Sequence, residues 1–258
     1  MRWATSAFSG CSRAMRRTAG AAGIGRVMAD SFAACGARIF LCDVDREALA
    51  ACPHPSVFAD VEGPEGCDAF MDAALQHFGG LDVLLNNAGI AGPTARVEDV
   101  APEDLSRTLK IDLEAMFHCA RRAVPALREA GGGSIVNLSS AAGRFGFPLR
   151  SPYAAAKWGV VGFTKSLAAE LGPDRIRVNA ILPGLVAGDR IRRVIEAKAQ
   201  AKGISFREEE AESLKNNSLG TYVTQHDITN MALYLCSPFG ATISGQALAV
   251  DGDMQSLV

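Results

Sequence analysis

Short apolar runs, each followed by a longer segment with helical periodicity, are the feature that most constrains the fold of this chain. Buried parallel strands read as nearly continuous apolar runs, and strands that alternate with helices favour a parallel sheet with helices on both faces. The apolar runs cover residues 37–43, 57–61, 81–85, 134–138, 176–181 and 242–252. The helical patterns cover residues 25–35, 63–78, 102–129, 153–171 and 225–235. We therefore expect an α/β fold with one doubly wound, mainly parallel sheet.

Composition bounds what such a domain can do. The 258 residues suit one domain, and the 48% that are hydrophobic suffice for a sizeable core. A formal net charge of −2 gives no strong attraction to nucleic acid or an anionic membrane, and no apolar stretch is long enough to span a membrane. The seven cysteines show no Cys-x-x-Cys pairing or metal-ligand spacing, which is typical of reduced thiols in a cytoplasmic protein. The four histidines are isolated, so we interpret them as surface or structural residues and expect no metal site.

The stretch from Ser139 to Lys157 carries the strongest chemical signal. Ser139 and Ser140 directly follow an apolar run, where the carboxyl edge of a parallel sheet places ligands. Tyr153 and Lys157 are four apart and share a face if the segment is helical. An ammonium about 4 Å from a phenolate attracts it by roughly 4 kcal/mol at an effective dielectric near 20, before desolvation. Tyr153 is therefore predicted to act as a general acid/base, with Ser140 binding the oxygen that gains or loses charge.

A lone Tyr-x-x-x-Lys pair is more often a solvated helix face, and the glycine-rich stretch at residues 18–25 gives this one its context. Its glycines would let backbone amides approach a pyrophosphate at the N-terminus of the following helix. Asp43 ends the next apolar run and could accept both ribose hydroxyls of NAD while repelling a 2′-phosphate. One like-charge pair at about 5 Å costs roughly 3 kcal/mol, or about 200-fold. The alternative for Asp43 is a helix-capping or turn aspartate.

Three groups of residues together resemble the short-chain dehydrogenase/reductase family. They are the serine, tyrosine and lysine above, the tetrapeptide Asn86-Asn87-Ala88-Gly89, and the turn Pro183-Gly184-Leu185-Val186. The resemblance implies a single doubly wound Rossmann-like domain at residues 18–258, with a mainly parallel seven-stranded sheet. It also implies a small-molecule alcohol or ketone substrate, NAD as the cofactor, a homotetramer or homodimer, and a substrate lid at about residues 189–219.

The same resemblance implies which residues hold the cofactor. They are Gly20, Gly23, Ile24, Gly25, Asp43, Asp60, Val61, Asn87, Ala88, Gly89, Tyr153, Lys157, Pro183, Gly184 and Val186. Within this set the resemblance places Asp60 near the adenine. The catalytic residues it implies are Ser140, Tyr153 and Lys157, with Asp112 at the position where relatives have an asparagine. Two further departures are Ala19, which replaces the first glycine of the turn, and Gly188, where relatives often have a threonine that holds the carboxamide.

Residues 1–17 are atypical because they contain arginines and no acidic residue. Such a start resembles a mitochondrial transit peptide, while a mis-called start, a frameshift or an artificial extension would also explain it. The family places a buried strand immediately before Thr18, but Arg13, Arg16 and Arg17 cannot all be buried without partners. We expect either a short strand with its arginines at the sheet ends or a poorly ordered segment.

The predicted function is the interconversion of a secondary alcohol and a ketone by hydride transfer with NAD(H). Two alternatives stay open: an NADP-dependent 3-oxoacyl-carrier-protein reductase, and a catalytically weak dinucleotide-binding protein. Phe145, Phe147 and Leu149 are expected to wall the substrate pocket. Arg150 could meet an anion there, although an exposed arginine is the commoner case, and the arginines at residues 190–193 leave the same alternatives.

Overall fold

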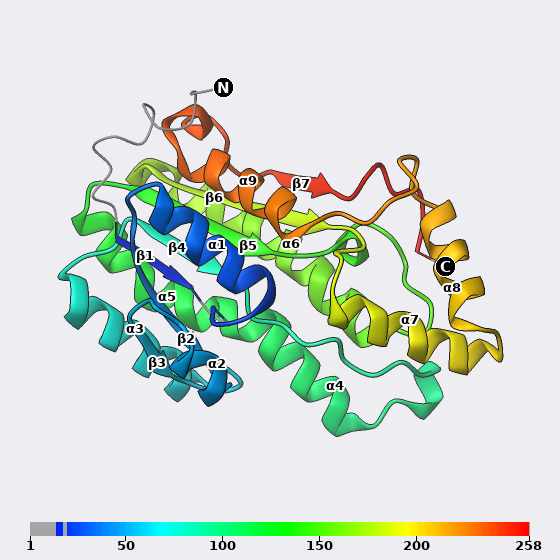
Figure 1. Cartoon of the computed structure of the whole chain (residues 1–258). Helices are drawn as coiled ribbons and strands as arrows, with labels where there is room; N and C mark the ends of the chain where they lie inside the picture. The colour runs from blue at the N-terminus through cyan, green and yellow to red at the C-terminus, as the bar shows by residue number, and fades with distance from the viewer. Residues whose placement is uncertain (1–13, 18–19, 258) are drawn as a thin grey trace.

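The strands form one seven-stranded sheet in the order β3-β2-β1-β4-β5-β6-β7, and every neighbouring pair is parallel (Figure 1). They are β1 (Ala14–Arg17), β2 (Arg38–Asp43), β3 (Ser56–Phe58), β4 (Val83–Asn86), β5 (Gly133–Leu138), β6 (Ile176–Pro183) and β7 (Ala247–Val250). The order reverses between β1 and β4, as in a doubly wound sheet. The predicted α/β class and parallel sheet are confirmed.

The structure is a computed structural model that describes residues 14–17 and 20–257. Of residues 14–17 it describes the backbone alone. Most of the predicted atypical segment, and Ala19 in the glycine-rich stretch, therefore lie outside the described residues. No helix in the described part of the chain is long and apolar enough to cross a membrane.

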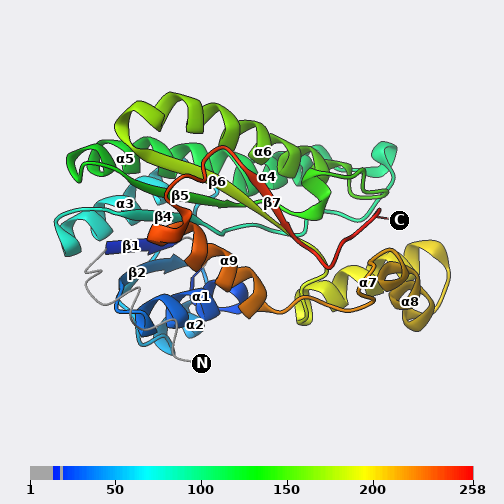
Figure 2. The ribbon, with the colours of Figure 1, turned by 90° about the horizontal axis from the view of Figure 1, so that it is seen from above.

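Helices cover both faces of the sheet. They are α1 (Gly23–Ala34), α2 (Arg46–Ala50), α3 (Pro64–Phe78), α4 (Pro102–Leu109), α5 (Ala115–Glu129), α6 (Ser151–Leu171), α7 (Asp189–Lys202), α8 (Phe206–Lys215) and α9 (Gln225–Cys236). Figure 2 shows α5 and α6 on one side of the sheet and α1 and α9 on the other. Two apolar clusters match these layers, since Phe70 of α3 and Cys119 of α5 share one, and Phe32 of α1 and Leu235 of α9 share the other. The sheet, whose carboxyl edge is the predicted location of the functional site, is thus buried on both faces.

The predicted helix over residues 102–129 is interrupted by one π-helical turn, η2 (Lys110–Glu114). Inside this turn the side chain of Asp112 is fully buried. A π-turn adds a residue to the helical ladder and is frequent at functional sites. The interruption therefore directs a carboxylate inward at a point where a continuous helix had been expected.

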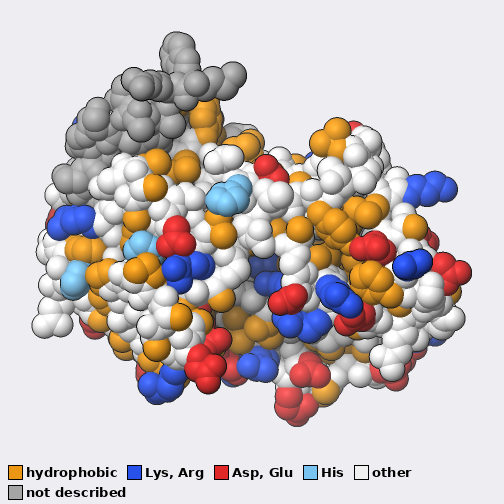
Figure 3. All heavy atoms as spheres, viewed as in Figure 1, with side chains coloured by type: hydrophobic (Ala, Val, Ile, Leu, Met, Phe, Trp, Pro, Cys, Tyr) orange, Lys and Arg blue, Asp and Glu red, His pale blue; other side chains and the backbone are white. Residues whose placement is uncertain are grey.

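The segment predicted as a lid consists of two helices, α7 and α8, with Gly203 in a left-handed conformation (φ 69°) between them. Both lie at one end of the molecule, beyond the arrowhead of β7 (Figure 1). Glu209 of α8 is fully buried, and its carboxylate oxygens each lie 2.8 Å from an ammonium of α7, those of Lys198 and Lys202. Figure 3 shows charged side chains of both signs at this end of the molecule, among hydrophobic and other side chains.

Residues 14–17 do take the central position of the sheet, as the four-residue strand β1. Its backbone pairs with β2 and β4, so Arg16 lies beside Phe40 and Leu84, and Arg17 beside Leu41 and Leu85. Those four neighbours are all buried. A strand between such neighbours favours apolar side chains.

Replacing residues 12–17 by an apolar, β-branched sequence should therefore raise the melting temperature. Each kcal/mol gained should raise it by about 2–4 °C in a domain of this size. Differential scanning calorimetry of the full chain measures the shift. The control is Arg96→Val, because the side chain of Arg96 is 76% exposed. An unchanged or lower melting temperature in the strand variant would contradict the expectation.

Candidate active site

The site lies at the carboxyl edge of the sheet, where β5 ends in two serines. Ser139 is buried, and its Oγ donates a hydrogen bond to the Lys157 backbone carbonyl at 2.8 Å. Ser140 is half-buried and caps the short 3-10 helix η3 (Ala141–Gly143), with its Oγ accepting from the Ala142 amide at 3.2 Å. Ser139 thus fixes α6 to the end of β5. This contact places Ser140 at the rim of the site.

Tyr153 and Lys157 lie on α6 as their spacing predicts. Lys157 is 3% exposed, and its Nζ donates to the Leu138 carbonyl at the end of β5, at 3.1 Å. The same Nζ lies 5.6 Å from the centre of the Tyr153 ring. An ammonium held in a buried position beside a phenol stabilises its deprotonated form. The structure therefore brings together the tyrosine, the lysine and the strand that precedes Ser140.

Asp112 completes this group from the π-helical turn. Its Oδ1 accepts a hydrogen bond from the Ile90 amide at 2.6 Å, and its Oδ2 lies 3.9 Å from Nζ of Lys157. Among the described residues, Oδ2 has no hydrogen-bond partner. A Cβ atom added at Gly89 would come within 2.9 Å of Oδ1, so only glycine fits between the carboxylate and the loop after β4. The predicted proximity of the aspartate and the lysine is thus present.

Asp112→Asn should raise kcat/KM for alcohol oxidation near pH 7 by up to about tenfold. The reason is that the carboxylate, whose Oδ2 lies 3.9 Å from Nζ of Lys157, offsets part of the field of that ammonium at Tyr153. Asparagine keeps an oxygen that can accept from the Ile90 amide. Steady-state kinetics check this, with Glu114→Gln on the exposed side of the same turn as the control. An unchanged kcat/KM in Asp112→Asn would show that the charge of Asp112 does not act on the phenol.

The glycine-rich turn fits a pyrophosphate. Gly20 donates from its amide to the Cys42 carbonyl at 3.0 Å, and a Cβ atom there would lie only 2.6 Å from Cβ of Leu41. Gly23 has φ 52°, a conformation that glycine adopts without strain. No side chain of the described residues caps the N-terminus of α1, so the amides of its first turn, including Ile24 and Gly25, suit an anion. The predicted binding of phosphate oxygens here stays a prediction that the geometry suits.

Asp43 is the last residue of β2 and is fixed beside that turn. Its Oδ2 accepts from the Ala21 amide at 3.1 Å, and its Oδ1 accepts from the Val44 and Asp45 amides at 2.8 and 3.2 Å. The turn role weighed above is therefore real, and it holds the carboxylate at the mouth of the glycine-rich turn. Asp60 is exposed, with Oδ1 accepting from the Glu62 amide at 3.0 Å, and Val61 is buried.

The nicotinamide side of the predicted cofactor site lies after β4 and β6. Asn87, Ala88 and Gly89 follow β4, and behind them Asn86 donates to Asn137 at 2.8 Å. Pro183 ends β6, and a Cβ atom at Gly184 would come within 2.7 Å of the Asp251 backbone. Val186 forms an isolated parallel bridge with Val223. These residues follow the carboxyl ends of two strands, and their binding of a cofactor stays a prediction.

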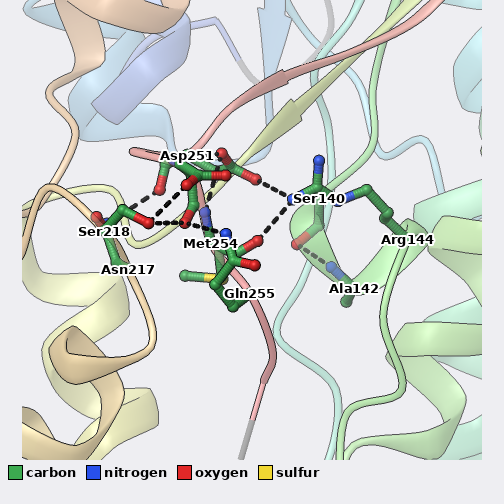
Figure 4. A network of polar contacts seen from close by, with 9 residues as sticks. Ser140, Ala142, Arg144, Asn217, Ser218, Asp251, Met254 and Gln255 are labelled. Carbon is green, nitrogen blue, oxygen red and sulfur yellow. Dashed lines mark hydrogen bonds and ion pairs between the residues drawn. The ribbon is translucent and has the colours of Figure 1, made fainter.

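Sequence reasoning missed Arg144, which joins the loop after Ser140 to the chain that follows β7 (Figure 4). Its Nη2 donates to Oδ2 of Asp251 at 3.1 Å and to the Met254 carbonyl at 2.7 Å. Asn217, beyond α8, donates to the Asp251 carbonyl at 3.0 Å. Three segments far apart in sequence are thus linked next to the site, and no sequence motif signalled it.

Two arginines lie next to the site. Arg150 is 2% exposed and donates from Nη2 to the Ala91 carbonyl, so of the two alternatives weighed from the sequence the exposed one does not apply to it. Arg190 of α7 is exposed and donates to the Gly89 and Ile90 carbonyls at 3.1 and 2.9 Å. Their guanidinium carbons lie 5.1 and 6.0 Å from the centre of the Tyr153 ring. By contrast, Arg192 pairs with Glu196 at 3.1 Å on the exposed surface of the same helix.

A doubly wound parallel sheet with this site at its carboxyl edge defines the class of a dinucleotide-dependent oxidoreductase. Among the described residues, no group of three or more histidine, cysteine or acidic side chains is arranged to hold a metal. The family model described as "Enoyl-(Acyl carrier protein) reductase" matches residues 19–255. The chain belongs to the short-chain dehydrogenase/reductase family.

Three similar proteins show the range of this family. A probable galactose dehydrogenase of Rhizobium meliloti (strain 1021) is 35% identical over 246 residues, which is 91% of this chain and 92% of the relative. The structure of an NAD⁺-bound xylitol dehydrogenase has a TM-score of 0.90 at 27% identity and covers 93% of this chain and 98% of its own. An actinorhodin polyketide ketoreductase with NADPH has a TM-score of 0.88 at 31% identity, covering 93% and 96%. The present chain is accordingly an oxidoreductase that acts on alcohols or ketones with a nicotinamide dinucleotide.

Proposed function

We propose that this protein interconverts a secondary alcohol and a ketone with NAD(H). The observation that carries the proposal is the buried Lys157, held by the Leu138 carbonyl and directed at Tyr153 beside the end of β5. In alcohol oxidation the Tyr153 phenolate accepts the proton of the substrate hydroxyl. Lys157 stabilises that phenolate, and Ser140 positions the substrate oxygen. When bound, the nicotinamide supplies the hydride acceptor or donor. Asp112 and the loop after β4 position the lysine.

The finer assignment to NAD rests on Asp43. Its carboxylate is fixed by three backbone amides next to the glycine-rich turn, where it suits ribose hydroxyls and opposes a 2′-phosphate. The similar structures hold NAD⁺ in one case and NADPH in another, so the cofactor of this chain must be measured. An NADP-dependent 3-oxoacyl-carrier-protein reductase is the second candidate, which the similarity to a polyketide ketoreductase with NADPH favours.

The test is a screen of polyols, sugars, hydroxy acids and a 3-oxoacyl thioester with both NAD and NADP. Turnover of a secondary alcohol with at least tenfold preference for NAD supports the proposal. Efficient reduction of the thioester with NADPH would support the second candidate. Binding of NADH without turnover of any compound would instead indicate a catalytically weak dinucleotide-binding protein, for which the buried charge of Asp112 next to Lys157 is the supporting observation.

The remaining expectations are also proposals. We infer a cytoplasmic location from the cysteines, since those of the described chain are thiols that form no disulfide with one another. We infer a homodimer or homotetramer from exposed aromatic side chains on α5 and α6. Phe117 is 49% and Trp158 51% exposed, and the Phe117 ring lies 4.0 Å from that of Phe163. Residues 189–219 act as a lid over the substrate, and their mixed surface charge suits a segment that faces solvent.

A further inference from the structure

Arg150 is a buried cation whose hydrogen bonds are incomplete. Its side chain is 2% exposed, yet within the described part of the chain Nε and Nη1 have no hydrogen-bond partner, while Nη2 donates to the Ala91 carbonyl. Burial lowers the pKa of Arg150, with Tyr153 and Asp112 opposing and Arg190 reinforcing the effect. Arginine remains protonated in proteins all the same. A buried charge with donors left over is costly, so it calls for a partner that the protein itself does not provide.

The guanidinium of Arg150 lies next to Tyr153, the residue proposed to transfer the proton. Arg150 is the N-cap residue of α6, and its guanidinium carbon lies 5.1 Å from the ring centres of both Phe147 and Tyr153. The preceding residue, Leu149, has φ 63°, a left-handed conformation that is strained for a bulky residue. No side chain caps this helix, and its first turn contains no acidic residue. The helix dipole therefore adds to the positive potential around the guanidinium.

The charges around Tyr153 do not balance. Lys157, Arg150 and Arg190 all have their cationic groups within 6.0 Å of its ring centre. In the described part of the chain, Asp112 is the carboxylate paired with this group, and it faces Lys157. Among the described residues, no carboxylate oxygen lies within 4.0 Å of a guanidinium nitrogen of Arg150 or Arg190, so neither arginine forms an ion pair there. The site thus has an excess of positive charge next to the proton-transferring phenol.

We propose that Arg150 binds an anionic group of the substrate, and that the enzyme's substrates are secondary hydroxy acids and the matching keto acids. The proposal rests on the proposed function and names its substrate class. A carboxylate accepts charge-assisted hydrogen bonds from a guanidinium, which are roughly twice as strong as neutral ones. With the carboxylate on Arg150, the carbinol of the same molecule lies at Tyr153.

Helix α7 covers this position. Arg190 of α7 approaches Tyr153 and donates to two carbonyls of the loop after β4, and Nζ of Lys198 lies 5.3 Å from the Phe147 ring centre. Nε and Nη1 of Arg150 are buried from solvent, so a carboxylate reaches them only when helix α7 moves away. The substrate therefore enters beneath α7, which gives the lid a defined ligand to admit.

The first experiment compares each hydroxy acid with its own carboxamide, which keeps the shape and removes the charge. Suitable pairs are 3-hydroxypentanoate with 3-hydroxypentanamide, and 4-hydroxypentanoate with 4-hydroxypentanamide. We expect wild-type kcat/KM to favour the acid by about 100-fold in at least one pair, the size of effect that follows from leaving a buried charge unpaired. In Arg150→Met the preference should fall to near one, mainly through KM. Arg150→Lys should keep about a tenth of it, because lysine preserves the charge but loses the planar donors.

Arg192→Met is the matched control, because Arg192 carries the same charge on α7 and its side chain is 71% exposed. Arg192→Met should leave the preference for the acid over its carboxamide unchanged. A structural role for Arg150 makes a different prediction, because Arg150→Met would then lower kcat/KM equally for acid and amide. That result, or equal use of acid and amide by wild type, overturns the proposal.

A binding measurement separates this proposal from the proposed function. The melting temperature of the full chain with NADH is compared in pentanoate and in pentanamide, for wild type and both variants. Pentanoate should stabilise wild type more than pentanamide does, and this difference should disappear in Arg150→Met. If neutral alcohols alone are oxidised and pentanoate gives no extra stabilisation, the function holds and the Arg150 site is wrong. If nothing is oxidised but pentanoate binds through Arg150, the anion site holds and the proposed reaction is wrong.

Discussion

Tyr153→Phe should lower kcat/KM for alcohol oxidation by about 1,000-fold while leaving the Kd for NADH within about twofold. A positioned acid/base group contributes about 10²–10⁴-fold to catalysis, and the substitution removes the proton-transferring hydroxyl and nothing else. The phenylalanine ring keeps the contacts with Lys157 and Arg150, whose cationic groups lie 5.6 and 5.1 Å from the ring centre. Steady-state kinetics and NADH fluorescence titration give the two quantities.

The chain offers a matched control in Tyr234, which lies on α9 and is 46% exposed. Tyr234→Phe makes the same chemical change away from the site and should leave both quantities unchanged. Turnover above about a tenth of wild type in Tyr153→Phe would show that another group moves the proton. Loss of NADH binding in the same variant would instead show that the hydroxyl mainly holds the cofactor.

Asp43→Asn combined with Val44→Arg should raise the ratio of kcat/KM with NADP to that with NAD by about 200-fold. Removing one like charge about 5 Å from a 2′-phosphate is worth roughly 3 kcal/mol. Asparagine keeps an oxygen that can accept from the backbone amides now held by Asp43. Val44 is 55% exposed, so an arginine there can reach a phosphate without disturbing the core.

Val44→Arg alone is the control, because it adds the cation and keeps the carboxylate. It should change the ratio by much less than the double variant. Equal use of NADP and NAD by the wild-type enzyme would show that Asp43 does not select the cofactor. In that case the three amide hydrogen bonds would be its main role, which is the turn function weighed from the sequence.

The parallel sheet and the positions of Tyr153 and Lys157 were predictable because both follow from spacing. Alternation of apolar runs with helical patterns fixes the layers, and a separation of four residues fixes a shared helix face. The π-turn at Asp112 was not predictable, because helical periodicity does not register one inserted residue. The burial of Arg150 was also missed, since an arginine in a loop is usually exposed and only the surrounding rings reveal otherwise.

The buried Glu209 has a consequence for how residues 189–219 can move. Parting α7 from α8 would break both ion pairs of this carboxylate, whose oxygens each lie 2.8 Å from an ammonium of α7. Helices α7 and α8 should therefore move together as one rigid unit. Gly188 and Gly220 lie on either side of this unit with φ of 140° and 62°, backbone angles that glycine adopts more readily than other residues. If the proposed lid opens about these two glycines, substitutions at Gly188 and Gly220 should change its opening without altering the residues that line the pocket.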